Sequence, residues 1–245
     1  MKKLSLVFLT MIFLMPSAKA INPSAKGNKE TVVTDNWYSM QVGQTPWGYY
    51  HEVILIKDGK YFYRYDMKKK ENNQFYEENL GAIAKDDLTP VAFNLNKKGP
   101  NLQESYNATY ETKDSVGIFS VTLKGSRFKT SKRHVAKNTI LEAFFPVWIS
   151  KHWNDISNGF RATLPIFTEE PESGEYMVKQ AKLQYKGERT VDQITCKDIE
   201  VEFDGRRSKW CFQNSTLVEM TIPGNDIVVK KTSSEAAAKK MLPET

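Results

Sequence analysis

Three histidines, three closely spaced glutamates and two cysteines are the residues whose types could support catalysis or ligand binding. His51 is expected to face Asp66 across a hairpin, and an imidazole oriented by a carboxylate is the base half of a nucleophilic triad. No Gly-x-Ser-x-Gly turn or comparable nucleophile motif accompanies this pair. We therefore interpret it as a cross-strand polar contact and assign no catalytic residue.

A second possible acid and base pair lies among Glu169, Glu170 and Glu172, which surround Pro171. Two carboxyl groups flanking a sugar linkage are what a glycosidase uses, but nothing in this spacing selects two of the three. A solvated loop is the simpler interpretation. A hydrolase that uses His51 or this loop as its acid or base stays an alternative function.

The spacing of the remaining candidates argues against a metal or cofactor site. His51, His134 and His152 are far apart, and none belongs to a His-Glu-x-x-His or similar ligand motif. Gly-rich phosphate loops and dinucleotide-binding fingerprints are absent from the sequence. We therefore expect neither a bound metal nor a cofactor.

Cys196 and Cys211 are the only cysteines, and we expect them to form a disulfide. The register of the surrounding hairpin places Cys196 opposite Gln213 and Cys211 opposite Asp198, so the cysteines are diagonal neighbours. Diagonal Cα atoms lie about 7 to 8 Å apart, beyond the usual disulfide limit of about 6.8 Å. A bulge, a strong twist or a slip by one pair would close this gap.

The first 20 residues have the pattern of a secretory signal peptide. Lys2 and Lys3 precede an apolar run from Leu4 to Met15, and the segment ends in Ala18-Lys19-Ala20. Cleavage is expected between Ala20 and Ile21, with no transmembrane segment after it. The residue directly after the cut is not a cysteine, so no lipid anchor is expected, and the sequence predicts a bacterial protein released into the periplasm or secreted.

Composition argues for one sizeable domain and against nucleic acid as a partner. Removal of the 20-residue signal leaves 225 residues, enough for one large all-β domain with a core of its own. It also removes three lysines, which lowers the formal net charge from +6 to +3. The remaining lysine runs, 68–70 and 97–98, are expected in solvated turns.

After a polar leader at 21–35, the sequence predicts antiparallel β structure. Alternating segments rich in Tyr, Phe, Val, Ile and Thr are separated by Asp-Gly, Lys-Gly and Pro-Gly turns. The clearest hairpin joins Trp47–Lys57 to Lys60–Asp66 through Asp58-Gly59. Its two faces are both apolar, so the sheet should be covered on both sides or line a cavity. One face would carry Ile54, Ile56, Tyr61, Tyr63 and Tyr65, and the other Trp47, Tyr49, Val53, Leu55 and Phe62.

The rest of the chain continues this pattern to residue 232. Strands are expected over Val91–Leu95, around Tyr106 and Phe119, and in a second well-specified hairpin, Ile194–Phe203 with Arg206–Gln213. That hairpin pairs Glu202 with Arg207 and Ile199 with Trp210. Strands Thr216–Ile222 and Ile227–Lys230 follow, and a short capped helix is predicted within the tail at 233–245.

The segment 138–153 is the exception, because its apolar residues recur at helical spacing. We expect a helical insert that is kinked or broken near Phe145, since Pro146 removes a backbone hydrogen bond. Its aromatic stripe is typical of core packing, and the functional alternative is a lid or plug over a ligand cavity.

Short motifs in this order resemble bacterial exported β-rich proteins of unknown function. They are Trp37–Gly43 with Gly48-Tyr49, then Leu88–Phe93, and finally the strands Cys196–Phe203 and Lys209–Ile222 with Trp210. Such proteins are similar to the periplasmic lipoprotein-carrier fold, a curved antiparallel half-barrel whose concave apolar face is covered by helices. The resemblance implies that the concavity is filled or gated by Phe144, Phe145, Trp148, Ile149 and Trp153. It transfers no catalytic residue.

Taken together, these features predict an exported, non-catalytic protein. It would bind an apolar or amphipathic envelope component, such as a lipid or lipoprotein, or act as an envelope scaffold. A hydrolase acting on an envelope polymer is one alternative. The other is a module that binds a partner through an exposed edge strand.

Overall fold

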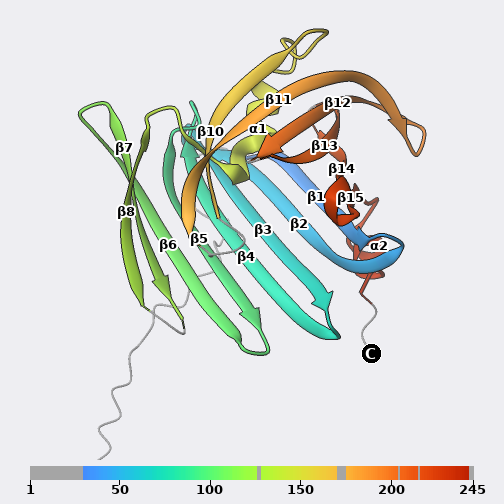
Figure 1. Ribbon diagram of the computed structural model, residues 1–245, viewed down its shortest axis with the longest axis horizontal. Helices are drawn as coiled ribbons and strands as arrows, with labels where there is room; N and C mark the ends of the chain where they lie inside the picture. The colour runs from blue at the N-terminus through green and yellow to red at the C-terminus, as the bar shows by residue number, and fades with distance from the viewer. Residues whose placement is uncertain (1–29, 126–127, 170–174, 204, 215, 243–245) are drawn as a thin grey trace, which may run out of the picture.

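The computed structural model describes residues 30–125, 128–169, 175–203, 205–214 and 216–242. The predicted signal peptide, its cleavage site at Ala20 and Ile21, and the polar leader up to residue 29 lie outside these residues. Within them the chain forms a single curved sheet of 15 strands (Figure 1). This confirms the predicted fold class, a mainly β protein built on a curved antiparallel sheet with few helices.

The first half of the chain is a meander in which each strand pairs with the next. Its strands are β1 (Thr31–Val42), β2 (Thr45–Lys57), β3 (Lys60–Glu71), β4 (Gln74–Lys85), β5 (Pro90–Gly99), β6 (Leu102–Lys113), β7 (Val116–Lys124) and β8 (Lys129–Ala136). The helical segment follows as β9 (Ile140–Leu141), the 3-10 turn η1 (Glu142–Phe144) and α1 (Phe145–Lys151).

The second half of the chain returns across the molecule until its last strand pairs with the first. It comprises β10 (Arg161–Glu169), β11 (Tyr176–Val191), β12 (Ile194–Phe203), β13 (Arg206–Gln213), β14 (Thr216–Ile222), η2 (Pro223–Asn225), β15 (Ile227–Lys231) and α2 (Glu235–Lys239). Because β15 pairs with β1, the two meanders join into one sheet, with β8 at one end and β9 at the other. All pairs are antiparallel except β9 with β10.

Both hairpins that the sequence specified have the predicted register. Leu55 lies opposite Phe62 and Ile56 opposite Tyr61, across a turn in which Asp58 and Gly59 have φ angles of 52° and 66°. In the other hairpin Glu202 lies opposite Arg207, and Ile199 lies opposite Trp210. Positive φ at both turn residues matches the right-handed twist of the flanking strands, which is why the two-residue turn fixes the pairing.

Trp47 departs from the predicted face because it is the extra residue of a β-bulge. Met40 pairs with Gly48 and Gln41 with Pro46, so Trp47 has no partner on β1, and its side chain reaches the concave side. Gly48 permits this bulge, since a Cβ there would lie 2.4 Å from the Lys68 carbonyl oxygen and 2.7 Å from the Met40 Cε. A bulge of this kind turns a side chain to the other face of a sheet.

The lysine runs lie in strands and not in turns, which corrects the prediction made for them. Lys68, Lys69 and Lys70 continue β3 and lie opposite Glu77, Tyr76 and Phe75, and the turn comes later, at Asn72 and Asn73. Lys97 and Lys98 continue β5 opposite Glu78 and Glu77. Opposite charges and aromatic rings across the ladder let these cationic segments stay in the sheet.

The disulfide between Cys196 and Cys211 is present, with Cα atoms 5.5 Å apart. Cys211 lies opposite Asp198 as predicted, and the regular ladder ends at Lys197 and Phe212. This Cα separation is shorter than the diagonal distance expected, and the neighbouring β13–β14 ladder is irregular at the same point, where Val218 of β14 is the extra residue opposite Cys211 and Phe212. The bond lies in a small buried cluster with Val191 and Val218, separate from the main core.

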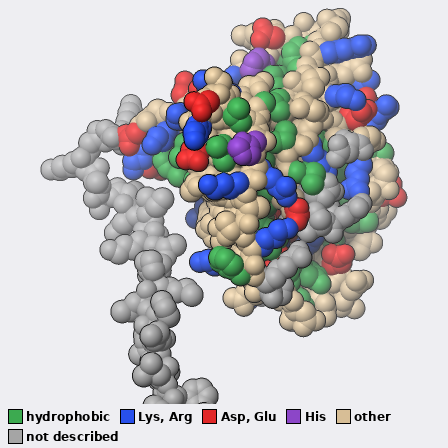
Figure 2. Space-filling model, turned by 60° about the vertical axis from the view of Figure 1, so that its left-hand side comes forward, with side chains coloured by type: hydrophobic (Ala, Val, Ile, Leu, Met, Phe, Trp, Pro, Cys, Tyr) green, Lys and Arg blue, Asp and Glu red, His purple; other side chains and the backbone are tan. Residues whose placement is uncertain are grey.

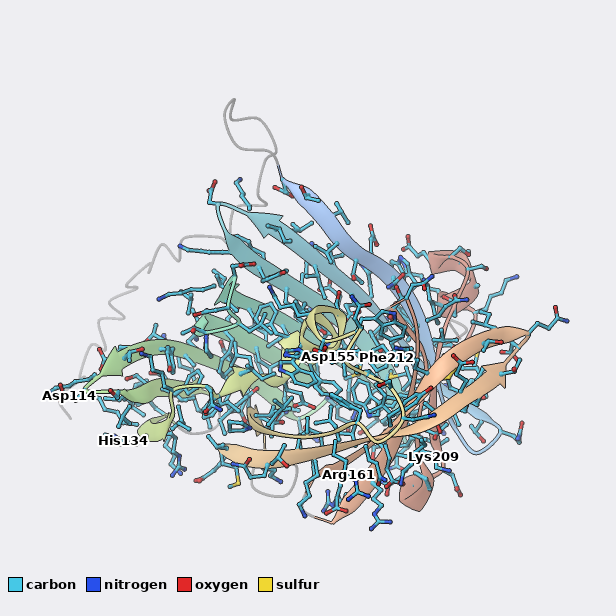
Figure 3. The ribbon with its side chains drawn as sticks, turned by 90° about the horizontal axis from the view of Figure 1, so that it is seen from above. Asp114, His134, Asp155, Arg161, Lys209 and Phe212 are labelled. Atoms are coloured by element: carbon cyan, nitrogen blue, oxygen red, sulfur yellow. A yellow bond between two sulfur atoms is a disulfide. The ribbon has the colours of Figure 1, made fainter. Side chains whose placement is uncertain are left out.

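The helical segment lies on the concave side and contacts both halves of the sheet. The Phe144 ring packs against Tyr63 of β3 at 6.0 Å, and the Phe145 ring meets Trp210 of β13 at 5.1 Å. Seen from above in Figure 3, the half that carries Asp114 and His134 and the half that carries Arg161 and Lys209 lie on opposite sides of an interior full of side chains. The segment therefore wedges between the two halves.

The helix itself is shorter than the predicted range 138–153. Residues 140–141 form a strand, a 3-10 turn follows, and α1 begins at Phe145 and ends at Lys151. Pro146 lies in the first turn, where its missing N–H has no intrahelical partner to lose. It therefore starts a helix instead of kinking one. The tail helix α2 is capped by Ser234, whose side chain accepts a hydrogen bond from the Ala237 N–H at 3.2 Å.

Candidate functional site

A cavity of about 440 Å³ lies on the concave side, between the sheet and the segment 141–146. Strands β1 to β5 form one wall, and β10, β13, β14 and β15 contribute to the other. Because successive side chains of a strand point to opposite faces, every second residue of β3 and β4 reaches this space. Aliphatic side chains form much of the lining, together with eight aromatic ones, namely Trp47, Tyr50, Tyr63, Tyr65, Phe93, Phe167, Tyr176 and Trp210.

Four carboxyl groups also line the cavity, and Glu52 is the most enclosed of them in the sheet wall. It sits in the middle of β2, is 6% exposed, and accepts hydrogen bonds from the Tyr38 and Tyr63 hydroxyls. Burial raises its pKa from 4.5 to about 7, although the two hydrogen bonds oppose the shift. Removing a charged group from water favours its neutral form, so Glu52 takes up a proton near neutral pH.

Glu142 brings a second carboxyl group from the helical segment. Its Oε2 accepts a hydrogen bond from the Thr168 hydroxyl of β10. The side chain is exposed and borders the cavity, although protein atoms crowd its carboxyl group. Burial raises its pKa, the Thr168 hydrogen bond and the charge of Lys179 lower it, and Glu169 raises it further.

Glu78 and Glu169 complete the acidic side of the cavity. Glu169 forms an ion pair with Lys97, whose Nζ lies 2.5 Å from both carboxylate oxygens. Glu78 lies opposite Lys97 on the neighbouring strand. Burial raises the pKa of Glu78, while the charges of Lys97 and Lys69 lower it. Glu169 is thus neutralised by a direct partner, and Glu78 feels its cations at longer range.

The five residues predicted to fill or gate the concavity belong to the packed interior. Phe144, Phe145 and Ile149 are at most 2% exposed, and Trp148 and Trp153 pack beside them half-buried. The segment reaches the cavity instead through Leu141, Glu142, Ala143 and Pro146. The predicted residues pack in the core, whereas Leu141, Glu142, Ala143 and Pro146 face the cavity.

The His51 pair lies on the convex face. His51 and Asp66 are opposite in the register as predicted, but the imidazole Nε2 contacts Asp35 at 2.7 Å and the ring stacks on Trp37 at 4.2 Å. Asp66 is held instead by Arg64 and Asn79, at 2.7 and 2.8 Å. Since Tyr50 and Glu52 reach the cavity, the intervening His51 points away from it. His134 lies on the terminal strand β8, and His152 stacks on Trp148 at 4.0 Å.

The edge strand β8 is strongly charged. It carries Lys129, Lys132, Arg133 and His134 within eight residues. Figure 2, which brings this side of the molecule forward, shows Lys and Arg side chains interspersed with apolar ones. Charges of this kind discourage pairing with a further strand, which weakens the case for a partner that adds to this edge.

The described residues contain neither a metal-binding cluster nor a membrane-spanning helix. No group of three or more His, Cys, Asp or Glu side chains there is arranged to hold a metal ion. None of the helices there has the length and apolar character needed to cross a membrane. Glu170 and Glu172, two of the three glutamates proposed as an acid and base, lie outside the described residues.

Of the carboxyl groups that line the cavity, Glu169 was a candidate from the sequence, whereas Glu52, Glu78 and Glu142 were not, although part of the signal for Glu52 was available. Alternation along β2 places Tyr50 and Glu52 on the same face as Ile54. The sequence predicts this face to be apolar. A glutamate at such a position marks either an exposed patch or a buried polar site. Glu142 gives no comparable signal, because its position depends on where the helix begins.

No family model matches the sequence, and no curated protein matches it. Among solved structures, a β-barrel-like protein of the domain of unknown function DUF1849 from Brucella abortus superposes with a TM-score of 0.50 and 8% identity, over 83% of this chain and 94% of that one. A DUF1089 family protein from Pseudomonas aeruginosa gives a TM-score of 0.42 and 9% identity, over 72% and 90% of the two chains. At this identity the likeness to the first protein shows the fold alone. Its barrel-like, β-rich architecture agrees with the expected resemblance to bacterial β proteins of unknown function.

Proposed function

We propose that this protein binds an apolar or amphipathic molecule in the concave cavity and performs no chemistry on it. The observation that carries the proposal is the cavity itself, about 440 Å³ bordered mainly by aromatic and aliphatic side chains. Binding pockets for small ligands are typically of this size, mostly apolar, with a few polar groups that fix orientation. Filling such a space with apolar groups would remove both the ligand and the wall from water.

The predicted signal peptide supports a location for this activity outside the cytoplasm. An envelope component such as a lipid, or the acyl part of a lipoprotein, would then be the ligand, with the protein acting as its carrier or as a scaffold. The resemblance to the lipoprotein-carrier fold supports the same idea, since that fold uses its concave apolar face. The wedge of residues 141–146 would limit how far an acyl chain can enter.

The test is binding of the neutral fluorophore N-phenyl-1-naphthylamine, followed by energy transfer from Trp47 and Trp210, which both line the cavity. We expect saturable binding to the wild-type protein. Replacing Ala82 by Phe would place a ring in the cavity, because Ala82 lies in its wall and is 3% exposed. This variant should weaken binding by about tenfold or more.

The matched control is Ala92→Phe on the neighbouring strand. Ala92 lies opposite Ile83, so its side chain points to the convex face while that of Ala82 points inward. It should bind the fluorophore like the wild type. Thermal unfolding of both variants establishes that each is folded. A wild-type protein that binds no fluorophore, or a folded Ala82→Phe variant that binds it as before, would rule out the cavity as a binding site.

A further inference from the structure

The charged side chains of the cavity wall are all acidic. Among the described residues that line it, four are glutamates and none is basic. The Lys97 side chain pairs with Glu169, which leaves Glu52, Glu78 and Glu142 without a directly bound cation among the described residues. An apolar cavity that holds three such groups is costly unless its occupant supplies complementary charge or hydrogen-bond donors.

Several polar groups in this wall also have unused hydrogen-bonding capacity. The hydroxyl of Tyr50, a partly buried side chain in the cavity wall, has no hydrogen-bond partner among the described residues, although its ring stacks on Tyr38 at 4.5 Å. Glu142 uses only Oε2 on Thr168, and Glu78 forms no hydrogen bond with a described residue. These groups face the open space of the cavity, where they can bond to a polar part of the occupant.

Glu78 and Glu142 border the same region of the cavity, although they come from β4 and from η1. Both charges act on the hydroxyl of Tyr65 and on that of Tyr176, and both contribute to raising the pKa of each tyrosine. Contacts link them as well: Glu142 accepts from Thr168, the residue before Glu169, and Glu169 pairs with Lys97, which lies opposite Glu78. A small head group in this part of the cavity would therefore be close to both carboxyl groups. The Tyr65 hydroxyl itself donates only to the Met67 sulfur, at 2.9 Å, which is a weak acceptor.

The other side of the cavity lacks such groups. Strands β1, β14 and β15 contribute Met40, Leu217, Met220, Ile227 and Val229 to the wall, all of them apolar. These strands are adjacent in the sheet and lie beyond β2, away from β4. The cavity is thus amphipathic, with an acidic side next to β4 and η1 and an apolar side along β14 and β15.

We propose that the occupant is a cationic amphiphile whose head carries a protonated primary amine. Its ammonium group would donate hydrogen bonds to Glu78 and to the free oxygen of Glu142, and its apolar chain would lie along β14 and β15. An ammonium has three donors and no acceptor, which suits a wall rich in free acceptors. The inference rests on the proposed function and narrows its ligand class.

The test compares three probes of equal chain length in displacing N-phenyl-1-naphthylamine from the wild-type protein. They are dodecylammonium, dodecan-1-ol and dodecanoate, each used below its micellar concentration at neutral pH. Dodecylammonium should bind about tenfold more tightly than the alcohol, in line with hydrogen bonds to charged groups. Dodecanoate should bind most weakly, since its charge is repelled by the carboxylates of Glu78 and Glu142.

Two variants and one control locate the effect. Glu78→Gln and Glu142→Gln should each lower the ratio of ammonium affinity to alcohol affinity by several-fold, because each removes an acceptor that carries charge. Glu77→Gln is the matched control. Glu77 is adjacent on β4, lies on the convex face and pairs with Lys68 at 3.9 Å, so the ratio should stay at its wild-type value.

The outcomes separate this inference from the proposed function. Failure of the wild-type protein to bind the neutral fluorophore would contradict the proposed function. Binding of the fluorophore with equal affinities for the ammonium and the alcohol would overturn only the cationic ligand. An ammonium-to-alcohol affinity ratio that keeps its wild-type value in both Gln variants would also overturn the cationic ligand, because the preference would then arise elsewhere in the molecule.

Discussion

Glu52 shows how one strand position can serve both packing and charge. Its neighbours on the inward face of β2 are Tyr50 and Ile54, and the hydroxyls of Tyr38 on β1 and Tyr63 on β3 donate to its carboxyl group. Two hydrogen bonds offset part of the cost of burying this group, but burial dominates and raises its pKa to about 7. The folded protein therefore prefers a protonated Glu52.

This preference predicts a pH dependence of stability that Glu52→Gln removes. Between pH 4.5 and about 7 the unfolded chain releases the Glu52 proton while the folded protein keeps it. The free energy of unfolding should therefore fall as pH rises through this range, by about 3 kcal/mol, and stay level above it. The Gln variant keeps an oxygen that accepts from Tyr38 and Tyr63 but cannot ionise.

Urea unfolding of the wild type and of Glu52→Gln at pH 5 and pH 8 measures the effect. The variant should gain stability relative to the wild type as pH rises, and Glu77→Gln serves as the control for losing a carboxylate on the convex face. A difference between wild type and Glu52→Gln that is the same at both pH values would mean that Glu52 ionises normally in the folded protein.

At the scale of elements, the disulfide links the ends of the β12–β13 hairpin without touching the cavity. Cys196 and Cys211 are separated by 15 residues and pack in a cluster with Val191 and Val218, apart from the main core. On the chain-entropy model, opening a loop of this length lowers the free energy of unfolding by about 3 kcal/mol. The double variant Cys196→Ser with Cys211→Ser should therefore be less stable and still bind N-phenyl-1-naphthylamine.

Urea unfolding and the fluorophore assay on the same double variant check both halves of this prediction. Wild-type protein unfolded in the presence of a thiol reductant should lose a similar amount of stability, which controls for the serine substitutions. Loss of fluorophore binding in a variant that is still folded would show that the disulfide shapes the cavity wall as well.

The elements that could be predicted from the sequence are those whose local signals agree. At Asp58-Gly59 the turn residues, the alternation and the cross-strand pairs all specify one register, and the hairpin forms as expected. The end of β3 could not be predicted from the sequence, because Lys68 to Lys70 have the composition of a solvated turn. Their strand conformation depends on partners in β4, which become neighbours only after the chain folds.

The candidate site likewise has features that local sequence predicts and features that it does not. The apolar character of the concave face follows from alternation, and the boundary near Phe145 follows from Pro146, which favours the first turn of a helix. The cavity wall does not follow, because Trp47 reaches it through a bulge and Glu142 through the 3-10 turn before α1. Tertiary packing decides both the position of the bulge and the residue at which the 3-10 turn begins.

For the whole molecule, the question is what holds together a sheet that does not close on itself. The terminal strand β8 shares no ladder with β9 or β10, and ion pairs link the two halves instead. Glu175, just before β11, binds Lys129 and Arg133 of β8, with the Arg133 Nη2 at 2.7 Å. Lys97 of β5 binds Glu169 at the end of β10 in the same way.

These ion pairs predict a salt-sensitive attachment of β8. Glu175→Gln should speed amide hydrogen exchange in peptides covering 129–136 and leave peptides of β2 and β3 unchanged. The wild-type protein should show the same change on going from about 0.1 M to about 1 M salt, where the screening length falls from about 10 Å to about 3 Å. Acid should act in the same direction, since the two cations hold the pKa of Glu175 below its usual value, and the contact is lost once this carboxylate is protonated.

The matched control is Lys132→Gln, which removes a charge from the same strand. Lys132 lies between Ser131 and Arg133, whose side chains face Glu175 and Tyr176, so its own side chain points to the opposite face. Exchange in β8 should stay at the wild-type rate in this variant and accelerate only in Glu175→Gln. Equal protection of β8 in both variants, at low and high salt, would mean that its hydrogen bonds to β7 suffice and that Glu175 does not help to hold it.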